Sequence, residues 1–281
     1  MVVFPTCKIN LGLRVLDKRA DGFHNIETIF YPVQWCDALE AIPESILTEN
    51  VVPTDRNNLS FETKGLKIDG SEKDNLCVKA FRLLQQKYNI PPVKMCLLKI
   101  IPIGAGLGGG SSDAGFTLKL LSDLFKLNIT GEELKAFASQ LGSDCPFFIE
   151  NTPVIASGRG DELHPIELVL SNYHVIIVIP PIHVSTKMAY ASIDSRKSTG
   201  KKLDEITRQP IEVWKEILKN DFEEIVFRQY PEIAKIKTQL YELGALYASM
   251  SGSGSAVYGI FKEQYPELSF PETYRIFKGK L

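Results

Sequence analysis

The sequence predicts a mixed α and β (α+β) chain of two domains, and three observations support this prediction. A length of 281 residues is enough for a large core and most simply gives two domains. A β-type segment, a glycine-rich loop and an amphipathic helix follow one another between Val93 and Leu124. The composition then changes, with a strongly apolar strand at Tyr173–Pro180 in the second half. We place the boundary after residue 155, which gives domains 1–155 and 156–281.

The composition is that of an ordinary soluble globular protein, with 44% apolar and 23% charged residues. A net charge of −2 argues against a bulk nucleic-acid binder. No apolar run approaches the roughly 18 residues of a membrane helix, and the N-terminus has no signal-peptide pattern. Five cysteines without a C-x-x-C pair are typical of reduced cytosolic thiols. We expect a cytoplasmic protein, monomeric or weakly dimeric, with no nucleic-acid or membrane partner.

Alternating polar and apolar residues predict a hairpin at the start of the chain. Residues 2–16 alternate as a strand does, so Lys8 and Asn10 point to the same face. Asp21-Gly22 is a turn dipeptide, and a second strand follows at Phe23–Val33. A lysine near the beginning of such a strand is usually a solvated edge charge, so the local sequence by itself does not assign a function to Lys8.

Turn signals and hydrophobic periodicity predict the other elements. In the first half we expect short strands and loops over 37–72 with an exposed turn at 53–58, and helices at 74–88, 113–125 and 131–141. Thr130 and Glu133 form a capping box for the last of these helices. In the second half we expect a strand beginning at Phe147–Ile149, a tight turn at 158–161, a helical turn at 185–191, a mobile segment at 194–202, helices over 211–243 and a strand–turn–strand over 246–261.

The loop after the predicted strand at Val93–Ile101 is the most informative stretch. It reads P-I-G-A-G-L-G-G-G-S-S-D-A from Pro102, with five glycines between Gly104 and Gly110. Such a loop exposes backbone N–H groups at the positive end of a helix, whose first turn Ser or Asp could cap. A flexible linker would not be flanked by a strand and a periodic helix. The stretch therefore predicts a phosphate cradle.

Two common phosphate loops do not fit this sequence. The Walker-type loop requires Lys and then Ser or Thr after its last glycine, but Gly110 is followed by Ser111 and Ser112. The dinucleotide pattern G-x-G-x-x-G is present, but its fold needs a second strand ending in an acid about 20 residues on. A helical stretch at Glu132–Leu141 follows instead. The loop is therefore of a third kind.

Three segments together resemble the three motifs of the GHMP kinase superfamily. They are P-T-C-K-I-N-L-G-L from Pro5, the glycine loop, and S-M-S-G-S-G-S-A from Ser249. The resemblance covers nearly the whole chain. It implies an N-terminal ribosomal-protein-type α/β unit that binds ATP, a C-terminal α/β sandwich-type domain that binds the substrate, and an active site in the cleft between them. The isoprenoid-precursor branch fits best, on K-I-N-L-G-L-x-V-x-x-K-R-x-D-G-F-H from Lys8, S-D-x-P-F-F from Ser143 and D-N-L from Asp74.

This branch implies ATP- and Mg²⁺-dependent phosphorylation of the 2-hydroxyl of 4-(cytidine 5′-diphospho)-2-C-methyl-D-erythritol, in the methylerythritol phosphate pathway. Asp144 matches the family's catalytic aspartate, which accepts the hydroxyl proton, and Lys8 matches its partner lysine. Mg²⁺ is expected to be carried by ATP, and Ser112 could add to its shell. The expected ATP contacts are Pro102, Gly104, Gly106, Leu107, Gly108, Gly109, Gly110, Ser111, Ser112, Asn75 and Lys99.

The same resemblance implies the contacts of the cytidylated substrate. Cytosine would stack on Phe23, with His24 hydrogen-bonded to the base and Tyr190 closing the other side of the sandwich. The full expected set is Asn10, Phe23, His24, Thr186, Tyr190, Gly252 and Ser253.

Three alternatives stay open at this point. The glycine loop fits equally another small-alcohol kinase of the superfamily, of the mevalonate or homoserine type. A non-catalytic nucleotide-binding relative or an RNA-binding module is also compatible with the fold. The presence of both Lys8 and Asp144 favours catalysis, and the net charge of −2 disfavours RNA.

Overall fold

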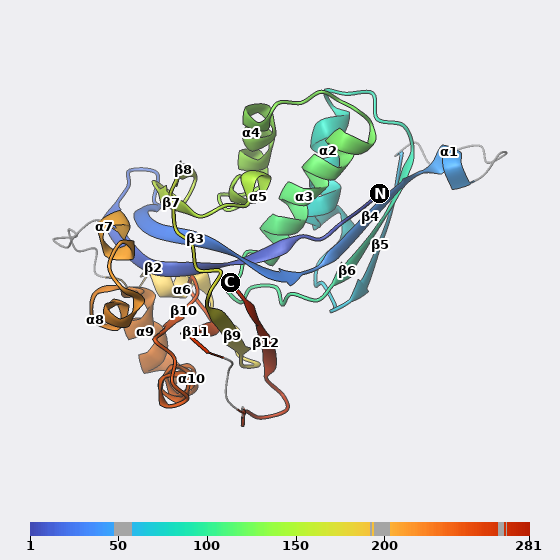
Figure 1. Cartoon of the computed structure of the whole chain (residues 1–281). Helices are drawn as coiled ribbons and strands as arrows, with labels where there is room; N and C mark the ends of the chain where they lie inside the picture. The colour runs from blue at the N-terminus through green and yellow to red at the C-terminus, as the bar shows by residue number, and fades with distance from the viewer. Residues whose placement is uncertain (48–57, 192, 194–202, 264–266, 268) are drawn as a thin grey trace. The chain divides into compact units, whose positions relative to one another are not determined.

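The computed structural model of the chain describes residues 1–47, 58–191, 193, 203–263, 267 and 269–281 (Figure 1). The predicted turn at 53–58, apart from Asn58, and the predicted mobile segment at 194–202 lie outside these ranges. Within them the chain forms three four-stranded sheets, with the orders β1-β4-β6-β5, β2-β3-β7-β8 and β10-β11-β9-β12. Among the described helices, none combines the length and the apolar character of a membrane span.

The chain divides into two compact units that interleave along the sequence. Unit 1 comprises Met1–Cys7, Cys36–Ile103 and Gly108–Asn151. Unit 2 comprises Lys8–Trp35, Gly104–Leu107 and Thr152–Leu281. The first strand hairpin and part of the glycine loop thus belong to the same unit as the C-terminal half. The predicted domain boundary at residue 155, and the predicted cleft, stay predictions.

Unit 1 is built on the sheet β1-β4-β6-β5, in which β6 pairs antiparallel with β4 and parallel with β5. Side chains of β4, β6, α2, α3 and α4 share one buried apolar cluster that includes Leu39, Phe81, Met95 and Leu118. The sheet contributes to this cluster through alternate residues, since every second residue of β6 is buried. The elements are β1 (Val2–Val3), β4 (Ala38–Pro43), α1 (Glu44–Leu47), β5 (Leu59–Gly65), η1 (Glu72–Asp74), α2 (Leu76–Gln85), β6 (Val93–Lys99), α3 (Gly109–Leu124), α4 (Gly131–Leu141) and α5 (Phe147–Glu150).

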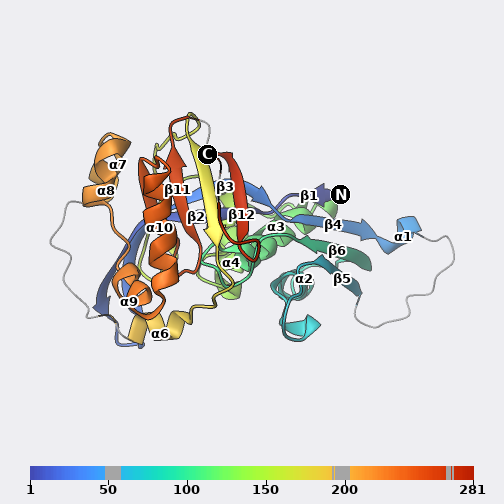
Figure 2. The same cartoon turned by 90° about the horizontal axis from the view of Figure 1, so that it is seen from below.

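Unit 2 contains the other two sheets and the C-terminal helices (Figure 2). A second apolar cluster joins β9, β10 and β11 to α9 and α10, with Ile176, Phe222, Ile236 and Val257 among its buried members. The elements are β2 (Thr6–Lys18), β3 (His24–Cys36), β7 (Val154–Ser157), β8 (Glu162–Pro165), β9 (His174–Ile179), α6 (Thr186–Ala191), α7 (Leu203–Thr207), η2 (Ile211–Val213), α8 (Trp214–Ile217), α9 (Phe222–Gln229), α10 (Pro231–Glu242), β10 (Tyr247–Met250), β11 (Val257–Phe261) and β12 (Arg275–Lys280).

Helix α3 begins four residues before the predicted start at Asp113, inside the glycine loop. Its N-cap is Gly108, in the left-handed conformation at φ 69°, and no side chain caps it. The predicted cap by Ser or Asp is therefore wrong. There is little room for a side chain at Gly109, since Lys99 Nζ and an Ile101 methyl lie 3.0 Å from the position of a Cβ. Close tertiary packing here outweighs the low helix propensity of glycine.

The segment Phe147–Glu150 is the helix α5, where the sequence predicts the start of a strand. Pro146 before it already has helical angles, with φ −58° and ψ −32°. Phe147, Phe148 and Ile149 are all buried. A short run of consecutive apolar residues has no period, so it fits a buried helical turn as well as a buried strand.

Candidate active site

Lys8 and Asn10 lie on the same face of β2, as the alternation predicts. Lys8 Nζ donates a hydrogen bond to Asn10 Oδ1 over 2.6 Å, and Asn10 Nδ2 donates to Thr28 Oγ1 over 2.9 Å. The exposed fractions of Lys8 and Asn10 are 4% and 1%. The ring of Phe30 lies 4.6 Å from the ammonium group, within cation–π range. Lys8 is thus a buried cation in a polar network and not a solvated edge charge.

The turn between β10 and β11 packs against the first part of the glycine loop. Ser251 Oγ donates to the carbonyl oxygen of Gly106 over 2.8 Å and accepts from the backbone N–H of Asn10 over 3.2 Å. A Cβ on Gly106, whose φ is +82°, would overlap the carbonyl oxygen of Ser251. Gly252 has a φ of +56°, and a Cβ there would lie 3.3 Å from Gly106 Cα. This backbone-to-backbone contact therefore requires glycine.

The first turn of α3 presents backbone donors that have no partner within the helix. The first N–H with a helical partner is that of Ser112, which donates to the carbonyl oxygen of Gly108 over 2.8 Å. The N–H groups of Gly109, Gly110 and Ser111 precede it and have no carbonyl within the helix. Because they lie at the positive end of the helix dipole, an anion would bind there favourably.

Ser112 adds a hydroxyl to this turn. The residue is fully buried, and its Oγ has no hydrogen-bond partner within the described part of the protein. A buried hydroxyl without a partner is costly, and a phosphate oxygen or a metal ion could pair with it. The residues of the turn therefore fit a polyphosphate with its cation. The described residues contain no group of three or more His, Cys, Asp and Glu that could hold a metal ion by itself.

Lys99 lies beneath this turn, and its ammonium group faces two carboxylates. Lys99 Nζ donates to Asp37 Oδ2 over 2.5 Å and to Asp113 Oδ2 over 2.7 Å, and its side chain has no exposed surface. Burial raises the pKa of Asp113 to about 7; attraction to Lys99 opposes this rise and the neighbouring Asp37 adds to it. The side chain of Lys99 is thus held in a buried ion-pair cluster, and its expected contact with adenosine stays a prediction.

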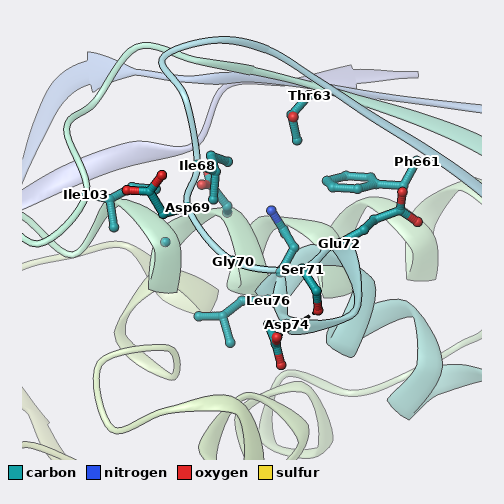
Figure 3. Close-up of a pocket in the computed structure, with 13 residues that line it drawn as sticks. Phe61, Thr63, Ile68, Asp69, Gly70, Ser71, Glu72, Asp74, Leu76 and Ile103 are labelled. Atoms are coloured by element: carbon teal, nitrogen blue, oxygen red, sulfur yellow. Dashed lines mark hydrogen bonds between the residues drawn. The ribbon is translucent and has the colours of Figure 1, made fainter.

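A cavity of about 320 Å³ opens beside α3 in unit 1 (Figure 3). Two of the predicted ATP contacts, Asn75 and Gly110, line it together. Asn75 is also the N-cap of α2, since its Oδ1 accepts from the N–H of Cys77 over 2.9 Å. The structure thus brings together two residues that lie 35 positions apart in the sequence.

The walls of this cavity are apolar and acidic. Phe61, Ile68, Leu76 and Ile103 supply the apolar surface, as Figure 3 shows. Asp69, Glu72, Asp74 and Asp113 supply carboxylates. Such walls suit a flat apolar ring and hydroxyl donors, whereas they would repel a phosphate.

The expected acceptor contacts all lie in unit 2. The rings of His24 and Tyr190 stack with centroids 5.3 Å apart, and Thr186 Oγ1 and Ser253 Oγ share a hydrogen bond of 2.9 Å. Phe23 is 58% exposed, and the guanidinium group of Arg159 lies 5.6 Å from its ring. The expected contacts of Phe23, His24 and Tyr190 with the base stay predictions.

Asp144 lies in unit 1, in the turn between α4 and α5, and is partly buried. The next residue, Cys145, is fully buried. Burial raises the pKa of the Cys145 thiol to about 12, against a hydrogen bond with Ser111 that lowers it. Asp144 thus lies between the end of α4 and the buried Cys145, and these two neighbours restrict its backbone.

Sequence reasoning missed several polar residues of these networks: Thr28, Asp37, Asn220, Ser251 and Tyr258. Ser251 belongs to the third motif, S-M-S-G-S-G-S-A, and could have been found there. Thr28 is the partner of Asn10 on the neighbouring strand, which only the register of β2 and β3 reveals. Asp37 and Asn220 stand in segments with no recognisable pattern.

Family models match the chain in two places. The model for the GHMP kinases N terminal domain matches residues 75–151, and the model for the GHMP kinases C terminal domain matches residues 203–268. Together these segments make up just over half of the chain. The chain is a GHMP kinase. Its predicted superfamily, its two-domain mixed α and β fold class and its kinase class are confirmed.

Curated relatives of this GHMP kinase match along its whole length. A protein of Azobacteroides pseudotrichonymphae is 49% identical over 94% of this chain and 95% of its own, and bears the name 4-diphosphocytidyl-2-C-methyl-D-erythritol kinase. A protein of Parabacteroides distasonis with the same name is 47% identical over 100% of both chains. The similarity to these relatives thus extends well beyond the three motifs.

Solved structures agree with this assignment. The crystal structure of a 4-(cytidine 5′-diphospho)-2C-methyl-D-erythritol kinase is 30% identical, with a TM-score of 0.75 over 92% of this chain and 89% of the other. The mevalonate kinase of Methanococcus jannaschii has a TM-score of 0.68 over 99% of this chain and 97% of its own, at 16% identity. At that identity the second similarity supports the fold alone.

Proposed function

We propose that this GHMP kinase transfers a phosphoryl group from ATP to the 2-hydroxyl of 4-(cytidine 5′-diphospho)-2-C-methyl-D-erythritol. The observation that carries the proposal is the full-length identity of 47–49% to relatives that bear the name of this kinase. The stacked pair His24–Tyr190 and the exposed ring of Phe23 support it, since a cytidine base is recognised by aromatic surfaces.

The donor nucleotide is assigned to unit 1. The apolar and acidic cavity beside Asn75 suits the adenine ring and the ribose hydroxyls. The phosphates would then lie at the first turn of α3. Gly110 belongs to that turn and also lines the cavity. The N–H groups of that first turn would hold the phosphate oxygens, and the hydroxyl of Ser112 would hold the polyphosphate or its Mg²⁺. Mg²⁺, when bound, offsets negative charge on the phosphates.

Two residues are assigned to the chemistry. Asp144 accepts the proton of the attacking hydroxyl, and Lys8 supplies positive charge to the phosphoryl group in transfer. Asn10 acts through Lys8, because its Oδ1 accepts from the ammonium group over 2.6 Å while its Nδ2 is held by Thr28.

A steady-state assay of ADP release tests the proposal. Purified enzyme is supplied with ATP, with or without Mg²⁺, and with either the cytidylated methylerythritol, mevalonate or homoserine. We expect turnover of the cytidylated alcohol only, dependent on Mg²⁺, and a loss of at least about a thousandfold in kcat for Asp144→Asn. Faster turnover of an uncytidylated alcohol would refute the substrate, and full activity of Asp144→Asn would refute the assigned base.

A further inference from the structure

Asn220 is a buried side chain that joins two functional segments of unit 2. It is 3% exposed, and it stands between α8 and α9, outside the motifs of the sequence. Its Nδ2 donates to the carbonyl oxygens of both Met250 and Gly252, each over 2.8 Å. Its Oδ1 accepts from the N–H of Phe222 over 3.0 Å. Three hydrogen bonds thus hold this amide in a single orientation.

The two carbonyl oxygens belong to the turn that carries Ser251, Gly252 and Ser253. Ser251 Oγ is hydrogen-bonded to the Asn10 N–H and the Gly106 carbonyl oxygen, and Ser253 Oγ is hydrogen-bonded to Thr186. The position of this turn therefore affects a predicted substrate contact and the neighbour of Lys8. Gly252 has a φ of +56°, and no side chain of its own fixes it.

The backbone around Asn220 is tied to β2, the strand of Lys8 and Asn10. Leu13 N–H donates to the carbonyl oxygen of Lys219 over 2.9 Å, and the N–H of Asp221 donates to the carbonyl oxygen of Leu13 over 2.9 Å. Asp221 Oδ2 accepts from the N–H of Val15 over 2.8 Å. The segment 219–221 thus lies against β2 with its backbone, while the side chain of Asn220 reaches the turn.

We propose that Asn220 is a positioning residue that holds the Ser251–Ser253 turn in register with the strand of Lys8 and Asn10, and so fixes the acceptor substrate for phosphoryl transfer. The proposal rests on the proposed function for the identity of that substrate. Only an amide at this position can donate to two carbonyl oxygens and accept one N–H, because a carboxylate has no proton to donate and would repel both oxygens. A glycine-rich turn without this restraint would sample other conformations.

The test compares the kinetics of Asn220→Asp and Asn220→Ser with those of the wild type, at a temperature where circular dichroism shows each variant folded. The expected result is a rise of about tenfold in KM for the cytidylated acceptor, or an equal fall in kcat, for Asn220→Asp. Asn220→Ser, which keeps one donor, should give a smaller effect of the same kind. If Asn220→Asp does not fold, Asn220→Ser is judged by the same criterion.

Tyr241→Phe is the matched control for stability. Tyr241 Oη donates to the carbonyl oxygen of Ala248 over 3.1 Å, in the strand β10 that leads to the same turn, so its loss weakens the strand without removing a restraint on Gly252. This variant should have a lower Tm and wild-type KM and kcat. Wild-type kinetics in folded Asn220→Asp and Asn220→Ser, or kinetic losses that track Tm equally in all variants, would overturn the proposal. A wild-type enzyme inactive on the cytidylated alcohol refutes the proposed function instead, and Asn220 is then judged with the alcohol that the enzyme does phosphorylate.

Discussion

The imidazole ring of His24 and the phenol ring of Tyr190 stack with centroids 5.3 Å apart and planes 17° from parallel. Tyr190 also meets Phe222 edge-on, with centroids 4.8 Å apart. The buried Phe222 therefore fixes the phenol ring from the core side. A base that stacks on Tyr190 has to use a face that His24 leaves open, or replace His24.

Replacement of Tyr190 tests its assignment to the acceptor. For Tyr190→Ala we expect KM for the cytidylated alcohol to rise about tenfold or more, since a stacked base contributes about 1–3 kcal/mol. KM for ATP should change by less than about twofold, because the cavity assigned to ATP lies in unit 1. Tyr190→Phe keeps the ring and serves as the control. Equal increases in both KM values would contradict the assignment.

Gly106 should not tolerate a side chain. Gly106→Ala would push a Cβ into the carbonyl oxygen of Ser251, so we expect kcat/KM to fall by roughly a hundredfold as the loop moves. Gly244→Ala is the control, because Gly244 has a similar φ of +93° but no atom within 4 Å of its Cβ position. That variant should lose about 1–2 kcal/mol of stability and no activity. Equal activity of the two variants would show that the contact with Ser251 is unimportant.

Removal of the buried ammonium group of Lys99 should destabilise the fold. Lys99→Met leaves Asp37 and Asp113 buried without their cation, and the free energy of unfolding in urea should fall by about 3–5 kcal/mol. Lys87→Met, which breaks an exposed ion pair with Glu133, should cost less than about 1 kcal/mol. A Lys99→Met enzyme of normal stability but with a raised KM for ATP would contradict this expectation and support the predicted contact with adenosine.

The Cys145 thiol should react slowly and with an unusual pH dependence. Its ordinary pKa of 9.0 is raised to about 12 by burial, so near pH 8 its thiolate fraction is about a thousandfold smaller than that of a free thiol. Alkylation by iodoacetamide, followed by peptide mass spectrometry, should accelerate about tenfold per pH unit well above pH 9, provided the protein stays folded. Protein unfolded in urea is the control, and its rate should level off near pH 9. A native rate that also levels off near pH 9 would exclude the raised pKa.

Local patterns were sufficient for elements whose signals lie within a few residues. The capping box of Thr130 and Glu133 is present, with α4 at Gly131–Leu141. The alternation in β2 correctly placed Lys8 beside Asn10. The start of α3 and the helix α5 were misjudged, because both depend on burial against distant segments. Lys99 and Ile101, for example, approach Gly109 closely in the first turn of α3.

The sequence by itself determined the family, the phosphate loop, and the residues expected to carry the reaction. These depend on short motifs whose residue types are set by chemistry: glycines for close approach, a lysine and an aspartate for charge, and aromatic rings for a base. The tertiary structure alone decided how those residues are held. Hydrogen bonds over separations such as that between Asn220 and Gly252, and the buried cluster of Asp37, Lys99 and Asp113, arise where the folded chain brings polar groups together away from water. No local pattern encodes them, because a buried polar group needs a partner in space and not at a fixed distance along the sequence.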